Sequence, residues 1–135
     1  MGESHTCNCS EIDCIEAKDI LIDNSKVTKS IKGILASKYT IHPSRGKFSS
    51  PILIFNEAKC IYGNFYLFGD GPNARFEQGN NITHIQLSLD KKEMEFHKKN
   101  KGSKVVVTGY FSRSNNANHT THPFFFIVDD IRKAE

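Results

Sequence analysis

The last third of the sequence places the strongest constraint on the fold. Residues 90–101 predict a short charged helix, because Asp90 and Glu93 stand at the spacing of a capping box and Gly102 supplies a C-terminal stop. Two apolar stretches follow, residues 104–111 (KVVVTGYF) and 124–128 (FFFIV), and a polar loop joins them. A strand, a capping helix and two final strands are how a small OB-type Greek-key barrel ends.

Earlier segments supply the remaining strands. Residues 30–36 predict a curved first strand in which Gly33 permits a bend, and residues 51–55 predict a second strand that continues at 60–62 after an interruption at 56–59. Residues 83–89 alternate, with Ile85, Leu87 and Leu89 on one face, which indicates a half-buried strand.

The fold class expected from these segments is mostly β. We predict a small five-stranded OB-like Greek-key barrel with one helix between strands 3 and 4. Residues 26–135 would form this domain, and residues 1–25 would form a polar, cysteine-bearing N-terminal arm. A length of 135 residues fits one domain, and no stretch of 18 consecutive apolar residues is present to span a membrane.

The chain has four cysteines, Cys7, Cys9, Cys14 and Cys60, which allow three disulfide pairings. A bridge between Cys7 and Cys9 would close a strained ring, so one candidate is a long-range disulfide between Cys14 and Cys60. The alternative is a metal site from His5 and the first three cysteines, but C-x-C-x4-C is not a usual zinc-knuckle spacing. We favour disulfides or inert thiols, and disulfides indicate an oxidising compartment.

The C-terminal half resembles a family of small exported bacterial domains without an established activity. The resemblance lies in a G-x-x-V-x-V-x-G strand at residues 102–109, a His- and Thr-rich loop ending in HTTHP at 119–123, and the apolar strand at 124–128. The segments NEAKC at 56–60 and HIQL at 84–87 also match. The resemblance implies an OB-like fold and an envelope location. We therefore expect a periplasmic or secreted protein whose signal peptide is removed, with a cytoplasmic location as the alternative.

Two polar loops are the candidate ligand-binding sites. In an OB barrel the loops after strands one and four border the binding face, and here they correspond to residues 39–50 and 112–123. Arg and His in both loops suit an anionic or carbonyl-rich partner, although polar loops are also common as solvated connectors. The candidate binding residues are His42, Arg45, Lys47, Arg113, Asn115, Asn116, His119 and His122.

The remaining histidine, phenylalanine and aspartate clusters do not by themselves predict a binding site. His119 and His122 could share a metal only with a third ligand, His42 or His84, so we expect no metal or other cofactor. Residues 124–126 are three phenylalanines, and at least one ring should enter the core, although a base-stacking platform is the alternative. The adjacent Asp129 and Asp130 should point to opposite faces and end the last strand.

The function expected from the sequence is non-enzymatic binding. The chain contains no G-x-S-x-G, H-E-x-x-H or phosphate-binding glycine motif. We expect an exported module that binds a protein or a small polar ligand through its rim loops, for example as an inhibitor or immunity protein. The alternative is a single-stranded nucleic-acid-binding OB module, although a net charge of +3 is mild for such a partner.

Overall fold

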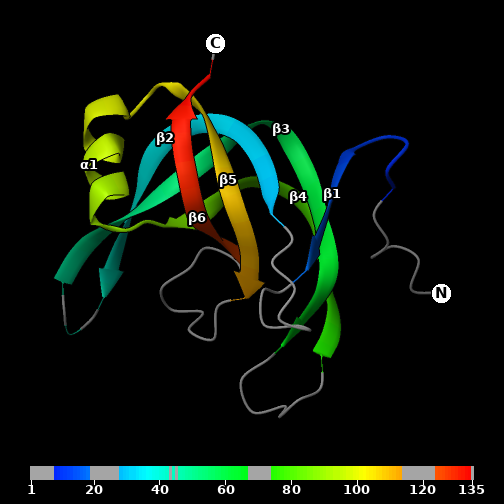
Figure 1. Cartoon of the computed structure of the whole chain (residues 1–135). Coiled ribbons are helices and arrows are strands. Elements are labelled where there is room, and N and C mark those ends of the chain that lie inside the picture. Colours follow the sequence, from blue (N-terminus) through cyan, green and yellow to red (C-terminus); the bar gives the residue numbers. More distant parts are fainter. Residues whose placement is uncertain are drawn as a thin grey trace.

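The computed structural model describes residues 8–18, 28–42, 44, 46–66, 74–113 and 124–134. In this part of the chain six strands form one sheet, and one helix follows the fourth strand (Figure 1). The elements are β1 (Asp13–Lys18), β2 (Lys29–His42), β3 (Gly46–Tyr66), β4 (Ala74–Ser88), α1 (Lys91–Asn100), β5 (Lys104–Arg113) and β6 (Phe124–Lys133). The predicted mostly-β class and the single helix near residues 90–101 are confirmed. The sheet has six strands and not five, and the helix follows the fourth strand and not the third, because β1 precedes the expected strands. The described residues include no helix that is long and apolar enough to cross a membrane.

Strand pairing connects five of the strands in a ring. The order in the sheet is β1-β3-β2-β5-β6-β4, and β3 also pairs with β4. Each of β2, β4, β5 and β6 therefore has two paired neighbours, and β3 has three. The pairs β1–β3 and β4–β6 are parallel, and the other pairs are antiparallel.

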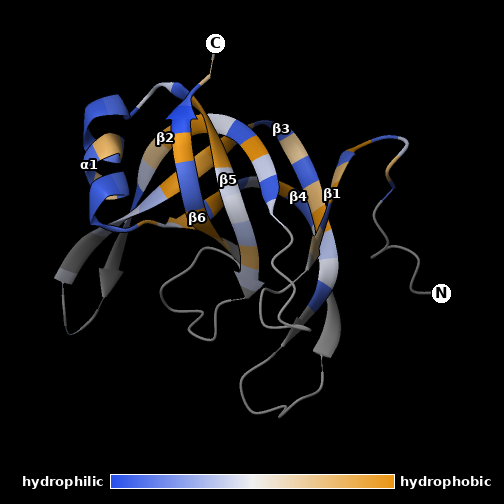
Figure 2. Ribbon diagram, in the orientation of Figure 1, coloured by the Kyte–Doolittle hydropathy of each residue, from blue (hydrophilic) through white to orange (hydrophobic). Residues whose placement is uncertain are grey.

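The core lies on the inward-facing residues of these strands. Ile85 and Leu87 on β4 are buried, as their alternation predicted, and Figure 2 shows apolar and polar bands alternating along the strands. Phe126 is fully buried and meets Phe111 edge to face, with 4.9 Å between the ring centroids. One ring of the triple-phenylalanine segment therefore belongs to the core, as predicted.

Helix α1 begins at the predicted capping box. Asp90 Oδ1 accepts from the Glu93 amide at 2.8 Å, and Glu93 Oε1 accepts from the Asp90 amide at 2.9 Å. His97 is buried, and its Nε2 donates to the carbonyl oxygen of Ala36 on β2 over 2.7 Å. Gly102 follows the helix at φ +93°, and its amide donates to the carbonyl oxygen of Leu35. The helix is thus fixed to β2 along its C-terminal half.

Part of the predicted arm belongs to the sheet. β1 lies beside β3 in parallel, with residues 13–18 opposite residues 59–64, and in Figure 1 it lies on the opposite side of the molecule from α1. Cys9 and Cys14 form a disulfide with a Cα–Cα distance of 5.5 Å, which closes the turn before β1. Their sulfurs are therefore not thiolates that could bind a metal.

The suggested disulfide between Cys14 and Cys60 is wrong. The two residues do lie opposite each other in the β1–β3 ladder, but Cys14 bonds to Cys9, only five residues away across the turn. Cys60 is also disulfide-bonded, and its side chain is fully buried. The sequence separation explains the difference, because a turn brings Cys9 back to the start of β1.

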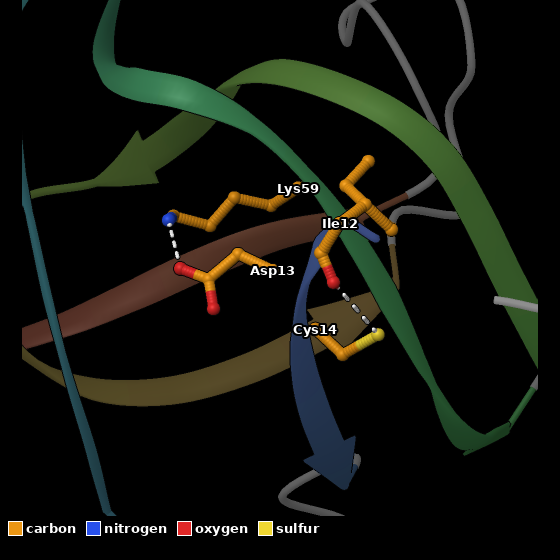
Figure 3. A network of polar contacts seen from close by, with 4 residues as sticks. All are labelled: Ile12, Asp13, Cys14 and Lys59. Atoms are coloured by element: carbon orange, nitrogen blue, oxygen red, sulfur yellow. Dashed lines mark hydrogen bonds and ion pairs between the residues drawn. The ribbon is translucent and has the colours of Figure 1, made fainter. Parts of the chain in front are cut away.

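An ion pair adds to the attachment of β1 (Figure 3). Lys59 Nζ lies 2.7 Å from Asp13 Oδ2, and the side chain of Lys59 is only 17% exposed, against 70% for Asp13. The same ammonium lies 5.6 Å from the centroid of the Phe55 ring. Cys14 Sγ lies 3.7 Å from the carbonyl oxygen of Ile12, a contact only, since a disulfide sulfur carries no hydrogen. β1 is thus held by backbone pairing, a disulfide turn and an ion pair.

Two irregularities change the expected strands. The predicted interruption at 56–59 appears as a register shift within β3, which continues to Tyr66. The expectation that Asp129 and Asp130 end the last strand is wrong, because β6 runs on to Lys133. A further register shift lies in the β5–β6 ladder. Thr108 pairs with Asp130 and Gly109 pairs with Val128, so Asp129 is an extra residue of β6 without a register partner. Both carboxylates therefore border the same hollow beside α1.

Candidate functional site

The predicted rim residues lie largely outside the described part of the chain. His42, Lys47 and Arg113 are placed as backbone at the ends of β2, β3 and β5, and their side chains are not described. The remaining five lie outside the described residues: Arg45, Asn115, Asn116, His119 and His122. The binding role of all eight residues stays a prediction.

The strand register separates the two predicted loops. In the β2–β5 ladder Lys29 lies opposite Gly109 and Ile34 lies opposite Lys104. His42 lies beyond the Ile34 end of this ladder, whereas Arg113 lies beyond the Gly109 end. The first loop therefore leaves the sheet at one end of this ladder, and the second leaves at the other.

A hollow of about 230 Å³ lies at the Ile34–Lys104 end of this ladder, on β2, β3, β5 and the residue after β6. We call it the lysine groove. It is lined by Lys32, Gly33, Ile34, Asn56, Lys104, Val105 and Ala134. The Ala134 amide donates to the carbonyl oxygen of Lys104 over 2.9 Å, so the end of β6 forms one side of the groove.

Gly33 allows β2 and β3 to approach each other closely at the lysine groove. A Cβ atom built on Gly33 would overlap the carbonyl oxygen of Ile54 and approach Cγ of Leu53 to 2.8 Å. Real Cβ atoms do not tolerate such distances from backbone, so any other residue would force β2 away from β3. Close approach of the two strands thus depends on glycine at this position.

Two exposed apolar side chains lie next to the groove. Ile34 and Ile54 lie opposite each other in the β2–β3 ladder and are 36% and 39% exposed. Tyr39, 60% exposed, lies further along β2. Among the described residues these three are the large hydrophobic side chains that are exposed, and all of them belong to β2 and β3. By alternation Tyr39, five positions from Ile34, lies on the other face of β2. Ile34 and Ile54 are direct neighbours on one face, which distinguishes them from single exposed residues, which need no explanation.

The polar side chains that line the groove have no partner among the described residues. Lys32, Lys104 and Asn56 are exposed, and in the described part of the chain their side chains make no ion pair or hydrogen bond. None of the described residues that line the groove is acidic. The groove therefore offers two ammonium groups and an amide above an aliphatic surface.

A second, larger hollow has the opposite charge. It has a volume of about 580 Å³ and lies between α1 and β6. Its lining includes five carboxylates and two lysines: Asp90, Glu93, Glu95, Asp129, Asp130, Lys92 and Lys99. Partial burial, together with the negative charges of Asp90 and Asp129, raises the pKa of Glu93, and the hydrogen bond from the Asp90 amide offsets part of this rise.

Metal ligands do not gather in the described part of the structure. Within the described ranges, no group of three or more His, Cys, Asp or Glu side chains could hold a metal ion. His84 lies beside Thr83, with 3.2 Å between Nδ1 and Oγ1. His119 and His122 lie outside these ranges, and the side chain of His42 is not described.

No known protein-family model matches the chain, and a search of curated proteins finds no match either. The resemblance to small exported bacterial domains therefore rests on the sequence motifs alone.

Proposed function

We propose that the chain is a non-enzymatic binding module built on a five-stranded OB-like barrel. The ring of pairings through β3, β2, β5, β6 and β4 supports this fold, as do the parallel β4–β6 contact and the helix between β4 and β5. β1 would then be an additional strand outside the barrel. OB barrels serve mainly as binding scaffolds, although a fold alone does not identify a ligand.

The observation that carries the binding role is the pair of exposed isoleucines, Ile34 and Ile54, beside two lysines that form no ion pair with a described residue. Ile34 and Ile54 leave apolar surface in water, and Lys32 and Lys104 beside them have no counter-ion in the described structure. An apolar patch with a polar border is typical of an interaction site. The partner we propose is a protein or a small polar ligand, and an inhibitor or immunity protein is the specific form of this proposal.

An exported location belongs to the same proposal. Disulfides persist mainly in oxidising compartments, and Cys9, Cys14 and Cys60 are all disulfide-bonded. This supports a periplasmic or secreted protein, in which the rim residues named above would extend the binding surface.

Site-specific photo-crosslinking in the cells that produce the protein tests the binding role. The photoreactive residue p-benzoylphenylalanine replaces Ile34 in one variant and Lys98, an exposed residue of α1, in the control. We expect a discrete adduct from position 34 that is absent from position 98. No adduct at 34, or equal adducts at both positions, would contradict binding at this face.

The alternative function is binding of single-stranded nucleic acid, which Lys32 and Lys104 also favour, since neither has an ion-pair partner among the described residues. Phosphate contacts would make the affinity for a fluorescent single-stranded oligonucleotide fall steeply with salt. Replacing Arg45, Lys47 and Arg113 together should abolish that binding. If the oligonucleotide does not bind, or binds without salt dependence, this alternative fails.

A further inference from the structure

We propose that the lysine groove binds an acidic protein segment that presents a carboxylate next to an aliphatic side chain. This inference rests on the proposed binding function and specifies the chemistry of the partner. It follows from how the register arranges cations, carboxylates and aliphatic groups on the outer face of β2, β3 and β5.

The two lysines are diagonal neighbours on that face. Lys32 lies opposite Val106, and Ile34 lies opposite Lys104, so each lysine is two positions from the residue that faces the other. Side chains at diagonal positions of neighbouring strands are within reach of each other when they are long. Two ammonium groups so placed repel each other. An anion bound between them would be attracted to both and would offset this repulsion.

The charges around the lysines also favour an anion. Arg132 on β6 lies opposite Val106, in the same row of the sheet as Lys32, and it is exposed. Two carboxylates lie near the groove without lining it: Glu57, which follows Asn56 on β3, and Asp130, which lies opposite Thr108 in the row beyond Arg132. Asp130 borders the acidic hollow instead of the lysine groove. Among the described residues, the lining of the groove thus has two cations and no acid, and Arg132 adds a third cation in the row of Lys32.

The apolar component of the ligand follows from Ile34 and Ile54. They lie side by side next to the Lys104 end of the groove, so an aliphatic side chain on the same segment as the carboxylate would cover them. Their exposed surface is aliphatic, and no aromatic residue is among those that line the groove in the described structure. Single-stranded nucleic acid is usually bound on aromatic stacking platforms, so the groove fits a peptide better.

The small volume of the groove also favours a protein partner over a small molecule. Its volume of about 230 Å³ is below that of typical small-molecule pockets, roughly 300–1,000 Å³. A carboxylate and one aliphatic side chain from a larger surface would occupy such a shallow hollow, and the rest of the contact would lie on the surrounding strands.

A synthetic peptide tests this chemistry. A fluorescent hexapeptide of alternating glutamate and leucine is titrated with the full-length protein and followed by anisotropy and by amide chemical shifts. We expect binding that weakens with added salt, with shifts at Lys32, Ile34, Ile54 and Lys104. Peptides with glutamine in place of glutamate, or serine in place of leucine, should bind about tenfold more weakly, since each lacks one of the two proposed contacts.

Paired variants locate the contact. Lys32→Gln with Lys104→Gln should weaken peptide binding about five- to tenfold, the effect of losing two exposed ion pairs. Lys91→Gln with Lys98→Gln removes the same charge from exposed positions of α1 and should leave the affinity unchanged. Equal melting temperatures of the two variants would show that both fold.

Three results would overturn the proposal: equal binding of the glutamine peptide, chemical-shift changes that avoid Lys32, Ile34, Ile54 and Lys104, or equal weakening of binding by both variant pairs. Displacement of the peptide by a single-stranded oligonucleotide would favour the nucleic-acid alternative. If the peptide does not bind while photo-crosslinking at position 34 still captures a partner, the proposed acidic character of the partner is wrong and the binding function stands. If both experiments fail, the proposed binding function is wrong as well.

Discussion

At the residue scale, Asp90 makes a clear contribution to α1. Its carboxylate accepts the Glu93 amide, one of the helix-terminal amides that would otherwise lack a partner. Asp90→Ala should lower the free energy of unfolding by about 1 kcal/mol, the usual cost of losing an N-cap, as measured by urea denaturation. Asp90→Asn keeps an acceptor oxygen and should cost much less. Equal losses in the two variants would show that the carboxylate does not act as a cap.

Glu93 should make stability depend on pH. Because its pKa is raised in the folded state, the folded chain holds this proton more tightly than the unfolded chain does. The wild-type protein should therefore lose stability as pH rises from the ordinary value of 4.5 through the raised pKa. Glu93→Gln cannot titrate and keeps the acceptor for the Asp90 amide.

Urea denaturation at a series of pH values compares the two proteins. The stability of Glu93→Gln relative to wild type should increase as pH rises through this window. Asp129→Asn removes one of the negative charges near Glu93, so in that background the effect should shrink. A relative stability that stays constant, or falls with pH, would contradict the raised pKa.

Asp90 and Glu93 show which side-chain interactions can be predicted from the sequence. The capping box is local, so the spacing of Asp90 and Glu93 predicted it correctly. The influence of Asp129 on Glu93 arises between β6 and α1 and depends on a register shift, which alternation cannot indicate. The same shift explains why the expectation for Asp129 and Asp130 was wrong.

At the scale of elements, Gly63 controls how β1 attaches to β3. A Cβ atom on Gly63 would overlap the carbonyl oxygen of Ala17, the residue opposite it on β1. Gly63→Ala should therefore cost about 1–3 kcal/mol and speed amide hydrogen exchange in residues 13–18. Asn64→Ala, at the exposed neighbouring position, should leave exchange unchanged. Normal exchange in Gly63→Ala would mean that β1 can shift to accommodate the methyl group.

The strands themselves were predicted only where they contact the core. The core segments at 51–55, 83–89 and 104–111 were found because their apolar residues alternate or run together. The hairpin of β2 and β3 beyond residue 36 and the extension of β3 to Tyr66 were missed. Their strands pair through backbone hydrogen bonds, which need no apolar pattern. Ile34 and Ile54, isoleucines at outward positions, were the signal that could have located the lysine groove.

At the scale of the whole molecule, the disulfides bear on the compartment. Alkylation under denaturing conditions, followed by intact mass, should leave Cys9, Cys14 and Cys60 unlabelled before reduction and labelled after it. A linked peptide containing Cys9 and Cys14 should appear in the unreduced digest. Free labelling of the protein from its native compartment would remove the main support for export and strengthen the nucleic-acid alternative.

The ring of strand pairings also sets how fast the chain can fold. Ser30 and Thr108, whose hydroxyls lie 2.8 Å apart across β2 and β5, are 78 positions apart in sequence, and Asp13 and Lys59 are 46 apart. Closing such long loops costs entropy before any contact repays it, so folding should take about milliseconds to seconds. β1 has only β3 to pair with in the described sheet, so it can join only after β3 has formed. Until then, this edge of β3 is open to strands of other chains.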